Sequence, residues 1–356
     1  MPKIILSFCG VLCFLVFGAC NVKKPDMTDE KQPGFKLGAA ISWGYLKNSE
    51  EYQNTVKENF QSVTFTNELK MKYLQKAEGE WDFSRVDSMI DFALEHHIQV
   101  HGHTLVWHYG NPPWVEKYDG DSAHLEDIMK QHIFKVVNHC KGRVVSWDVV
   151  NEAISDTAEN YFRKTIWYRN LGEGFIERAF RYAHEADPQA LLFYNEYGIE
   201  RDTLKFSKTI QMVRRLQEKG VPIHGIGFQM HTQVGWPPIS LVDSTVKVAA
   251  ATGLLIHFSE VDVSVNGITT QKGYLTSFEK DMSMAQKVRY EQLAEIFNNI
   301  PKNQQFAFTT WGVHDGSSWL RNHYIRNKPE WPLLFDDNFV AKPAFHAIQK
   351  IRNNEK

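Results

Sequence analysis

Two glutamates each follow a short run of apolar and β-branched residues. Glu152 follows the segment 144–151, and Glu260 follows the segment 254–259. Runs of this kind are typical of strands buried in a sheet, so each carboxylate would lie at the rim of that sheet. Two carboxylates brought together in this way can divide the roles of proton donor and of nucleophile or base. The cleavage of a glycosidic bond depends on such a division.

Eight short, apolar segments alternate with stretches that have helical spacing. The predicted strands are 35–40, 62–66, 98–102, 144–149, 190–195, 225–229, 254–259 and 305–310. Two predicted helices have clear ends, since 173–186 stops before Pro188 and 203–219 stops at Gly220. Eight strand–helix units without a break in composition predict an α/β fold, a single (β/α)8 TIM barrel. A doubly wound sheet is the alternative, but no Gly-x-Gly-x-x-Gly turn follows the first strand.

Polar side chains cluster where the predicted strands end. They are Asn67, Lys70, His103, Trp107, Asn151, Glu152, Asn195, Glu196, Gln229, His231, Glu260, Asp262 and Trp311. Active groups of (β/α)8 barrels lie at the carboxyl ends of the strands. Chance would scatter these residues over both rims, so their convergence predicts one site.

Composition argues against several other classes of protein. The 356 residues are 43% hydrophobic and 23% charged, as in an ordinary globular protein. The net charge of −2 offers no basic surface for nucleic acid, so we expect no nucleic-acid partner. No cysteine or carboxylate completes a ligand set around His101 and His108, so we expect no metal and no cofactor.

Residues 1–19 have the features of a signal peptide. Lys3 supplies a positive charge, and the apolar run 4–17 is shorter than the ~20 residues that a membrane-spanning helix needs. The small residues before Cys20 resemble the signal of a bacterial lipoprotein, in which the cysteine carries lipid. We therefore expect export and lipid anchoring to a bacterial membrane, at its periplasmic face or at the cell surface.

The rest of the chain divides into a tether and one domain. Residues 20–33 are polar, contain two prolines and predict a flexible tether, and residues 34–356 predict the barrel. Cys9 and Cys13 would leave with the signal. Cys140 then remains as the other cysteine, and we expect it to be a buried thiol without a disulfide.

Four motifs together resemble those of glycoside hydrolase family 10. The motifs are HGHTLVWH at 101–108, WDVVNEA at 147–153, GIGFQMH at 225–231 and SEVD at 259–262. The resemblance extends from about Phe35 to Arg352, with the motifs in the family's order. It implies a retaining endo-β-1,4-xylanase on a (β/α)8 barrel, acting on xylan and xylo-oligosaccharides, and we expect a monomer.

The resemblance also implies roles for individual residues. Glu152 matches the general acid/base and Glu260 the nucleophile, while His231 and Asp262 match the residues that support the nucleophile. Asn151 would hold the 2-hydroxyl of the sugar being cleaved. The other residues implied in substrate binding are Asn67, Lys70, His103, Trp107, Gln229, Trp311 and Trp319 on the non-reducing side, and Asn195 and Tyr197 on the leaving-group side. Glu196 and Gly198 stand where Asp and Asn are frequent.

One position departs from the family's pattern. Thr66 stands in TNELK at 66–70, where the family commonly has ENEMK and its first glutamate binds the second sugar before the cleavage point. Threonine cannot make that charge-assisted hydrogen bond. We therefore expect a second glycone subsite that is weaker, or that accepts a decorated sugar.

Two other functions remain open from the sequence. A non-catalytic xylan-binding barrel would keep the cleft but lack a catalytic carboxylate, and both carboxylates are present. A related retaining β-glycanase acting on glucan or mannan would share the two glutamates, but not the motif at 101–108 or Lys70.

Overall fold

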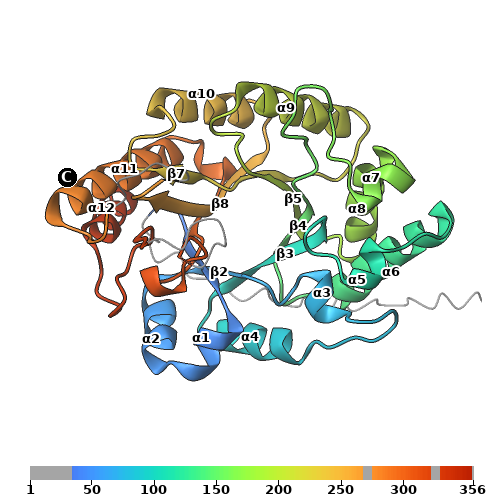
Figure 1. Ribbon diagram of the computed structural model, residues 1–356, viewed down its shortest axis with the longest axis horizontal. Coiled ribbons are helices and arrows are strands. Elements are labelled where there is room, and N and C mark those ends of the chain that lie inside the picture. The colour runs from blue at the N-terminus through green and yellow to red at the C-terminus, as the bar shows by residue number, and fades with distance from the viewer. Residues whose placement is uncertain (1–33, 268–274, 322–328, 355–356) are drawn as a thin grey trace, which may run out of the picture. The chain divides into compact units, whose positions relative to one another are not determined.

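The barrel is built from parallel strands that pair in chain order. The computed structural model describes residues 34–267, 275–321 and 329–354 (Figure 1). Its strands are β1 (Leu37–Ile41), β2 (Ser62–Phe65), β3 (Gln99–Trp107), β4 (Ser146–Asn151), β5 (Leu191–Glu196), β6 (Gly225–Phe228), β7 (His231–Gln233), β8 (Leu255–Ser264) and β9 (Gln305–Thr310). The pairings of β1 with β9 and of β6 with β8 close the ring, so eight strands form the barrel and β7 pairs with the end of β8.

Helices surround this ring of strands, as Figure 1 shows. They are α1 (Trp43–Asn48), α2 (Glu50–Asn59), α3 (Met71–Leu74), α4 (Ser84–Glu95), α5 (Pro113–Glu116), α6 (Ser122–Cys140), α7 (Ile166–Leu171), α8 (Gly174–Ala186), α9 (Thr203–Glu218), α10 (Ile239–Ala250), α11 (Lys280–Asn298) and α12 (Pro343–Arg352), with 3-10 turns η1 (Lys302–Gln304) and η2 (Asp315–Ser317). The two helices predicted with clear ends are α8 and α9. Phe175, Ala179 and Ala183 of α8 are buried, so this stripe packs toward the barrel.

The inside of the barrel holds a layer of rings below the polar rim. The ring of His101 lies 4.8 Å from that of His257, and the ring of Phe193 lies 4.7 Å from that of Phe306. Burial lowers the pKa of His257 well below its usual value, so this imidazole is neutral. The interior is therefore a packed floor on which the rim residues rest.

All eight predicted strands are present, but two of them continue five residues further than expected. The strand predicted at 98–102 runs to Trp107, and the one predicted at 254–259 runs to Ser264. β3 keeps pairing with β4 up to Trp107 and Asn151, after a shift in register. Consequently His103, Trp107 and Glu260 lie within strands rather than beyond them.

Expectations were also made for Cys140 and for the N-terminal residues 1–33. Cys140 is free and fully buried at the end of α6, as expected. The expected signal, the lipidated Cys20 and the tether fall on residues 1–33, outside the described residues. Among the residues that the structure does describe, no helix combines the length and the apolar character needed to cross a membrane.

Candidate active site

Glu152 occupies the position directly after β4, in an uncommon backbone conformation. Its φ is +58°, in the left-handed region, which is rare for a residue other than glycine. Such a conformation costs roughly 1–3 kcal/mol and persists only where the surroundings fix it. Here its backbone N–H donates to the carbonyl oxygen of Asn195 at 3.0 Å, which ties the turn to β5.

Neutral donors hold the carboxylate of Glu152. The indole N–H of Trp107 donates to Oε2 at 2.9 Å, and the amide of Gln229 donates to Oε1 at 3.0 Å. The amide of Asn151 lies 3.3 Å from Oε1. The side chain is nearly buried, and all three of these donors are uncharged.

Glu260 lies within β8 and has a different set of neighbours. Asn195 donates to its Oε1 at 2.8 Å, and Nε2 of His231 lies 3.4 Å from its Oε2. Nδ1 of the same imidazole contacts Asp262 at 2.8 Å, and Trp319 also donates to Asp262 at 2.8 Å. The carboxylate of Glu260 thus faces an imidazole that a second carboxylate orients.

Acidic neighbours keep the imidazole of His231 protonated. Burial acts to lower its pKa, but the charges and hydrogen bonds of Asp262 and Glu260 outweigh burial and raise the pKa to about 10. At neutral pH His231 is therefore a cation beside Glu260. The two groups lie within ion-pair distance, and a carboxylate in such a site can act as a nucleophile toward carbon.

Two amide side chains connect the two glutamates. Asn195 donates both to Glu260 and, at 3.0 Å, to the side-chain oxygen of Asn151, whose own amide faces Glu152. The hydroxyl of Ser259 donates to the oxygen of Asn195 at 2.6 Å and fixes which way its amide points. The two carboxylates therefore face one space from opposite ends of a short hydrogen-bonded chain.

A second group of predicted residues gathers around Lys70. Its ammonium donates to Asn67 at 3.2 Å and lies 4.8 Å from the ring centre of Trp107. Burial lowers the pKa of Lys70 to about 8, although the charges of Glu260 and Glu152 oppose that shift. Asn67, Lys70 and Trp107 therefore form one wall beside the carboxylates.

The predicted His103 is fixed by a buried carboxylate. Its Nδ1 contacts Asp148 at 2.8 Å, and His101 contacts the same oxygen at 3.1 Å. Burial acts to raise the pKa of Asp148, but the two histidines hold it below its usual value. His103 in turn packs against Trp311, with ring centres 5.3 Å apart.

Thr66 lines a cavity next to this wall. The cavity has a volume of about 250 Å³ and is lined by Ala40, Ser42, Tyr52, Thr66, Asn67, Trp311, Gly312, Ser317 and Trp319. The hydroxyl of Thr66 donates to the backbone oxygen of Ile41 at 2.7 Å, so it has no proton left for a ligand. Sequence reasoning missed Ser42 and Tyr52, because neither lies in a motif.

On the other side of Glu152, Tyr197 belongs to a network of charges. Its hydroxyl donates to Asp156 at 2.6 Å and accepts from Arg163 at 2.8 Å. The ammonium of Lys205 lies 3.3 Å from the centre of its ring. Sequence reasoning identified Tyr197 but not Asp156, Arg163 or Lys205, which lie outside the motifs. Within residues 34–267, 275–321 and 329–354, no group of three or more His, Cys, Asp or Glu side chains could hold a metal.

Comparison with known proteins identifies a family and several relatives. The model of glycosyl hydrolase family 10 matches residues 27–351. The chain is 38% identical to a β-1,4-xylanase of Dictyoglomus thermophilum over 347 residues, which cover 98% of this chain and 96% of the relative.

Solved structures are similar over most of the barrel. Xylanase XynB of Paenibacillus barcinonensis, complexed with a conduramine derivative, matches with a TM-score of 0.84 and 35% identity, over 88% of this chain and 95% of that chain. A mutant of xylanase 10C of Cellvibrio japonicus, in complex with xylopentaose, matches with a TM-score of 0.86 and 34% identity, over 91% and 68%.

Proposed function

This chain belongs to glycosyl hydrolase family 10 and is a retaining endo-1,4-β-xylanase, and from that premise we propose that Glu260 is its nucleophile and Glu152 its acid/base. One observation carries the assignment, namely the contrast between the two sets of neighbours. Glu260 faces the cationic His231, whereas the side chain of Glu152 is held by the neutral donors Trp107, Gln229 and Asn151.

In the first step, a carboxylate oxygen of Glu260 attacks the anomeric carbon of the sugar. The bond from that carbon to the leaving oxygen breaks, and Glu152 gives its proton to that oxygen. The product is a glycosyl ester on Glu260. Asn151, between the two glutamates, would hold the 2-hydroxyl of the same sugar, a contact that strengthens in the transition state.

In the second step, water attacks the anomeric carbon and Glu152 takes up a proton from it. The ester bond breaks and Glu260 leaves as a carboxylate, so two inversions give net retention. The cation of His231 stabilises the charge that returns to Glu260. Its partner Asp262 keeps the imidazole protonated and oriented in both steps.

Xylan and xylo-oligosaccharides are the substrates we assign to this cleft. Asn67, Lys70, His103, Trp107 and Gln229 would bind the non-reducing side, with Trp311 and Trp319 as the aromatic wall around it. Tyr197 would contribute on the leaving-group side, whereas Asn195 is fully buried and would act by orienting Glu260 and Asn151. The grouping of Asn67, Lys70, Trp107 and the cavity that includes Trp311 and Trp319 on one side of Glu152 supports this division.

Covalent trapping tests the nucleophile. A 2-fluoro xylobioside with a good leaving group should accumulate as an ester on one residue, and peptide mapping should find it on Glu260. A label on another residue would contradict the assignment. Assays on xylan, carboxymethyl cellulose and mannan test the substrate, since a β-glycanase for glucan or mannan would prefer another polymer and a binding barrel would cleave none.

We also propose that residues 1–19 are a signal and that residues 20–33 tether the barrel to a bacterial membrane through lipid on Cys20. The sequence around Cys20 supports this proposal, and residues 34–356 would then form the catalytic domain. The C20S variant should move from the membrane fraction to the soluble fraction. Because one chain supplies every residue of the site, we further propose a monomer, which light scattering of the purified protein checks.

A further inference from the structure

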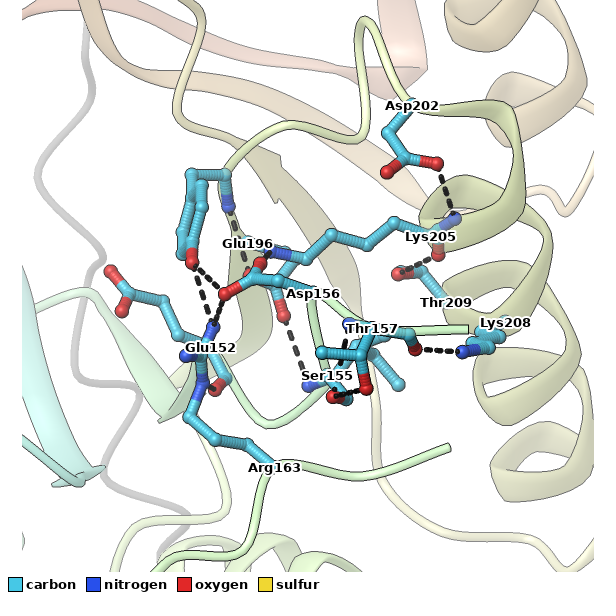
Figure 2. Close-up of polar contacts among 12 residues, drawn as sticks. Glu152, Ser155, Asp156, Thr157, Arg163, Glu196, Asp202, Lys205, Lys208 and Thr209 are labelled. Carbon is cyan, nitrogen blue, oxygen red and sulfur yellow. Dashed lines mark hydrogen bonds and ion pairs between the residues drawn. The ribbon is translucent and has the colours of Figure 1, made fainter. Parts of the chain in front are cut away.

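Four charged side chains form a cluster beside the proposed acid/base, and we refer to Asp156, Arg163, Glu196 and Lys205 as the charge cluster. The ammonium of Lys205 lies 3.0 Å from Glu196 and 2.8 Å from Asp156. Arg163 lies 3.0 Å from Asp156 on its other side. Figure 2 shows Lys205 reaching from α9 between the two carboxylates. Two cations thus balance two anions.

Glu196 is the buried end of this cluster. Its residue is fully buried, and Lys205 is 3% exposed. Besides Lys205, its Oε1 accepts from the backbone N–H of Tyr197 at 3.1 Å. Its Oε2 accepts from the hydroxyl of Tyr194 at 2.6 Å and from the backbone N–H of Ile154 at 3.2 Å. Four donors therefore point at one carboxylate.

The cluster is bonded to the strained turn at Glu152 from both sides. Arg163 donates from Nε to the backbone oxygen of Glu152 at 3.1 Å. The hydroxyl of Tyr194 accepts from the backbone N–H of Ala153 at 3.0 Å, and Glu196 and Tyr194 both accept from Ile154. The two peptide groups that follow Glu152 are thus held by groups that the cluster orients.

We propose that the charge cluster is a positioning unit for the acid/base, in which Glu196 fixes the left-handed turn that aims the carboxylate of Glu152. The inference rests on the proposed role of Glu152. Glu196 and its partners touch the backbone of the turn rather than the reacting atoms, so they act through Glu152. The assignment adds Glu196, Lys205, Asp156 and Arg163 to the residues on which the reaction depends.

A merely structural ion pair would not need this arrangement. Burying two charges is costly, and a well-packed apolar pair is often as stable as a buried salt bridge. Here two of the four donors to Glu196 are Ile154 N–H and the Tyr194 hydroxyl, which hold the turn. Burial raises the pKa of Glu196, Lys205 opposes the shift and the charge of Glu152 adds to it, so the two glutamates interact electrostatically.

Leaving-group dependence distinguishes positioning of the acid from a general loss of structure. Xylo-oligosaccharides need protonation of the leaving oxygen, whereas 2,4-dinitrophenyl β-xylobioside does not. In E196Q an amide NH2 replaces an oxygen that accepts from two donors, so those bonds are lost and the turn shifts. We expect kcat/KM on xylohexaose to fall roughly 10²-fold, the scale of a misplacement near 1 Å. On the dinitrophenyl substrate kcat/KM should stay within about threefold of wild type.

The second chemical step gives an independent readout at the same residue. On the dinitrophenyl substrate, kcat reports deglycosylation, in which Glu152 activates water with no sugar in the leaving-group site. E196Q should lower this kcat, and azide should restore it, because azide needs no base. A defect confined to binding the leaving group would leave this kcat unchanged and would overturn the proposal.

Lys208 offers a matched control on the same helix. It is a buried lysine of α9 that donates to the backbone oxygens of Thr157 and Asn160, and it has no contact with Glu196 among its hydrogen bonds. K205M should reproduce the E196Q pattern, whereas K208M should leave the ratio of the two kcat/KM values at the wild-type level. If K208M changed this ratio as much as K205M does, the effect would come from general rigidity of the loop and not from the charge cluster.

A conservative variant keeps the test valid if E196Q does not fold. E196D retains the charge but shortens the reach, so the same pattern should appear with a smaller, severalfold loss. Equal fractional losses on both substrates in E196D, or none, would overturn the proposal. Failure of the proposed function itself would look different, because Glu152→Ala would then show no leaving-group dependence.

Discussion

The two glutamates of the site are the same side chain in two different settings. Glu260 lies inside a regular strand and faces a cation, His231, which Asp262 keeps protonated. Glu152 lies on a left-handed turn, and its carboxylate is held by an indole and two amides. The regular backbone carries the proposed nucleophile, and the left-handed turn carries the proposed acid/base.

This contrast shows how one side chain can serve two roles at one pH. Glu260 is paired with a cation, whereas the hydrogen-bond donors to the carboxylate of Glu152 are all uncharged. Pairs of titratable groups in contrasting environments are how one site combines acid and base chemistry. Arg163, a cation close to Glu152, donates to its backbone oxygen rather than to its carboxylate.

The most severe test removes the proposed nucleophile. Glu260→Ala should abolish turnover on every substrate, because the glycosyl ester cannot form without this carboxylate. Azide should restore activity by attacking in its place, and the product should be the inverted glycosyl azide, identified by NMR. Full activity in the variant would contradict the assignment of Glu260.

Removing the acid should have a large effect that depends on the substrate. Glu152→Ala should lose roughly 10²–10⁴-fold in kcat/KM on xylan, the scale of general acid catalysis. Aryl xylobiosides with good leaving groups should keep most of their kcat/KM, and azide should give a product of retained configuration. Equal losses on aryl xylobiosides and on xylan would mean that Glu152 is not the acid.

The cation beside Glu260 predicts a pH dependence of stability. The pKa of His231 is raised from 6.5 to about 10 in the fold. Its stabilising contribution is therefore complete below about pH 6.5 and is lost as the pH rises toward 10. Compared with His231→Asn, the wild type should have its largest advantage in free energy of unfolding near pH 6. Urea titrations at pH 6 and pH 9.5 measure the difference.

A second histidine provides the control for that measurement. Burial lowers the pKa of His224, which lies before β6 and away from the two glutamates. Its contribution therefore does not fall over the same range, and His224→Asn should show no loss of wild-type advantage between pH 6 and pH 9.5. If the advantage over His231→Asn is constant with pH, His231 is not a cation in the fold.

The sequence predicted the strands well because buried parallel strands are continuous apolar runs. It placed the ends of β3 and β8 too early, since these strands go on through His103, Glu260 and Asp262, whose polarity suggests a loop. Inside the barrel those side chains satisfy one another across strands, which periodicity does not reveal.

The charge cluster could not be predicted in the same way. Asp156 and Lys205 are separated by 49 positions and meet only when α9 packs beside the loop after β4. Neither residue lies in a motif, and an isolated Asp or Lys is usually a solvated surface group. A buried lysine becomes informative only when the fold shows which carboxylates it contacts.

Thr66 extends the contrast to a position that has no carboxylate at all. Its side chain is neutral, its hydroxyl is used by Ile41, and it lines the cavity that also includes Asn67, Trp311 and Trp319. In Thr66→Glu a carboxylate would face the second glycone sugar, where a charge-assisted hydrogen bond is worth roughly 1.5–3 kcal/mol. Since 1.4 kcal/mol is about tenfold, kcat/KM on short xylo-oligosaccharides should rise about tenfold or more.

The activities of Thr66→Glu on different substrates show whether the absence of a carboxylate at position 66 weakens the subsite or widens it. Long xylan is held by many subsites, so its kcat/KM should change less than that of short oligomers if Thr66 marks a weakened subsite. If the cavity beside Thr66 instead accepts a decoration on the sugar, Thr66→Glu should lose activity on decorated xylan and gain little on linear oligomers. Thr66→Val, which is neutral and similar in size, is the matched control, because it replaces the hydroxyl with a methyl group and adds no charge. No change on either substrate in Thr66→Glu would show that the second glycone sugar does not reach this wall of the cavity.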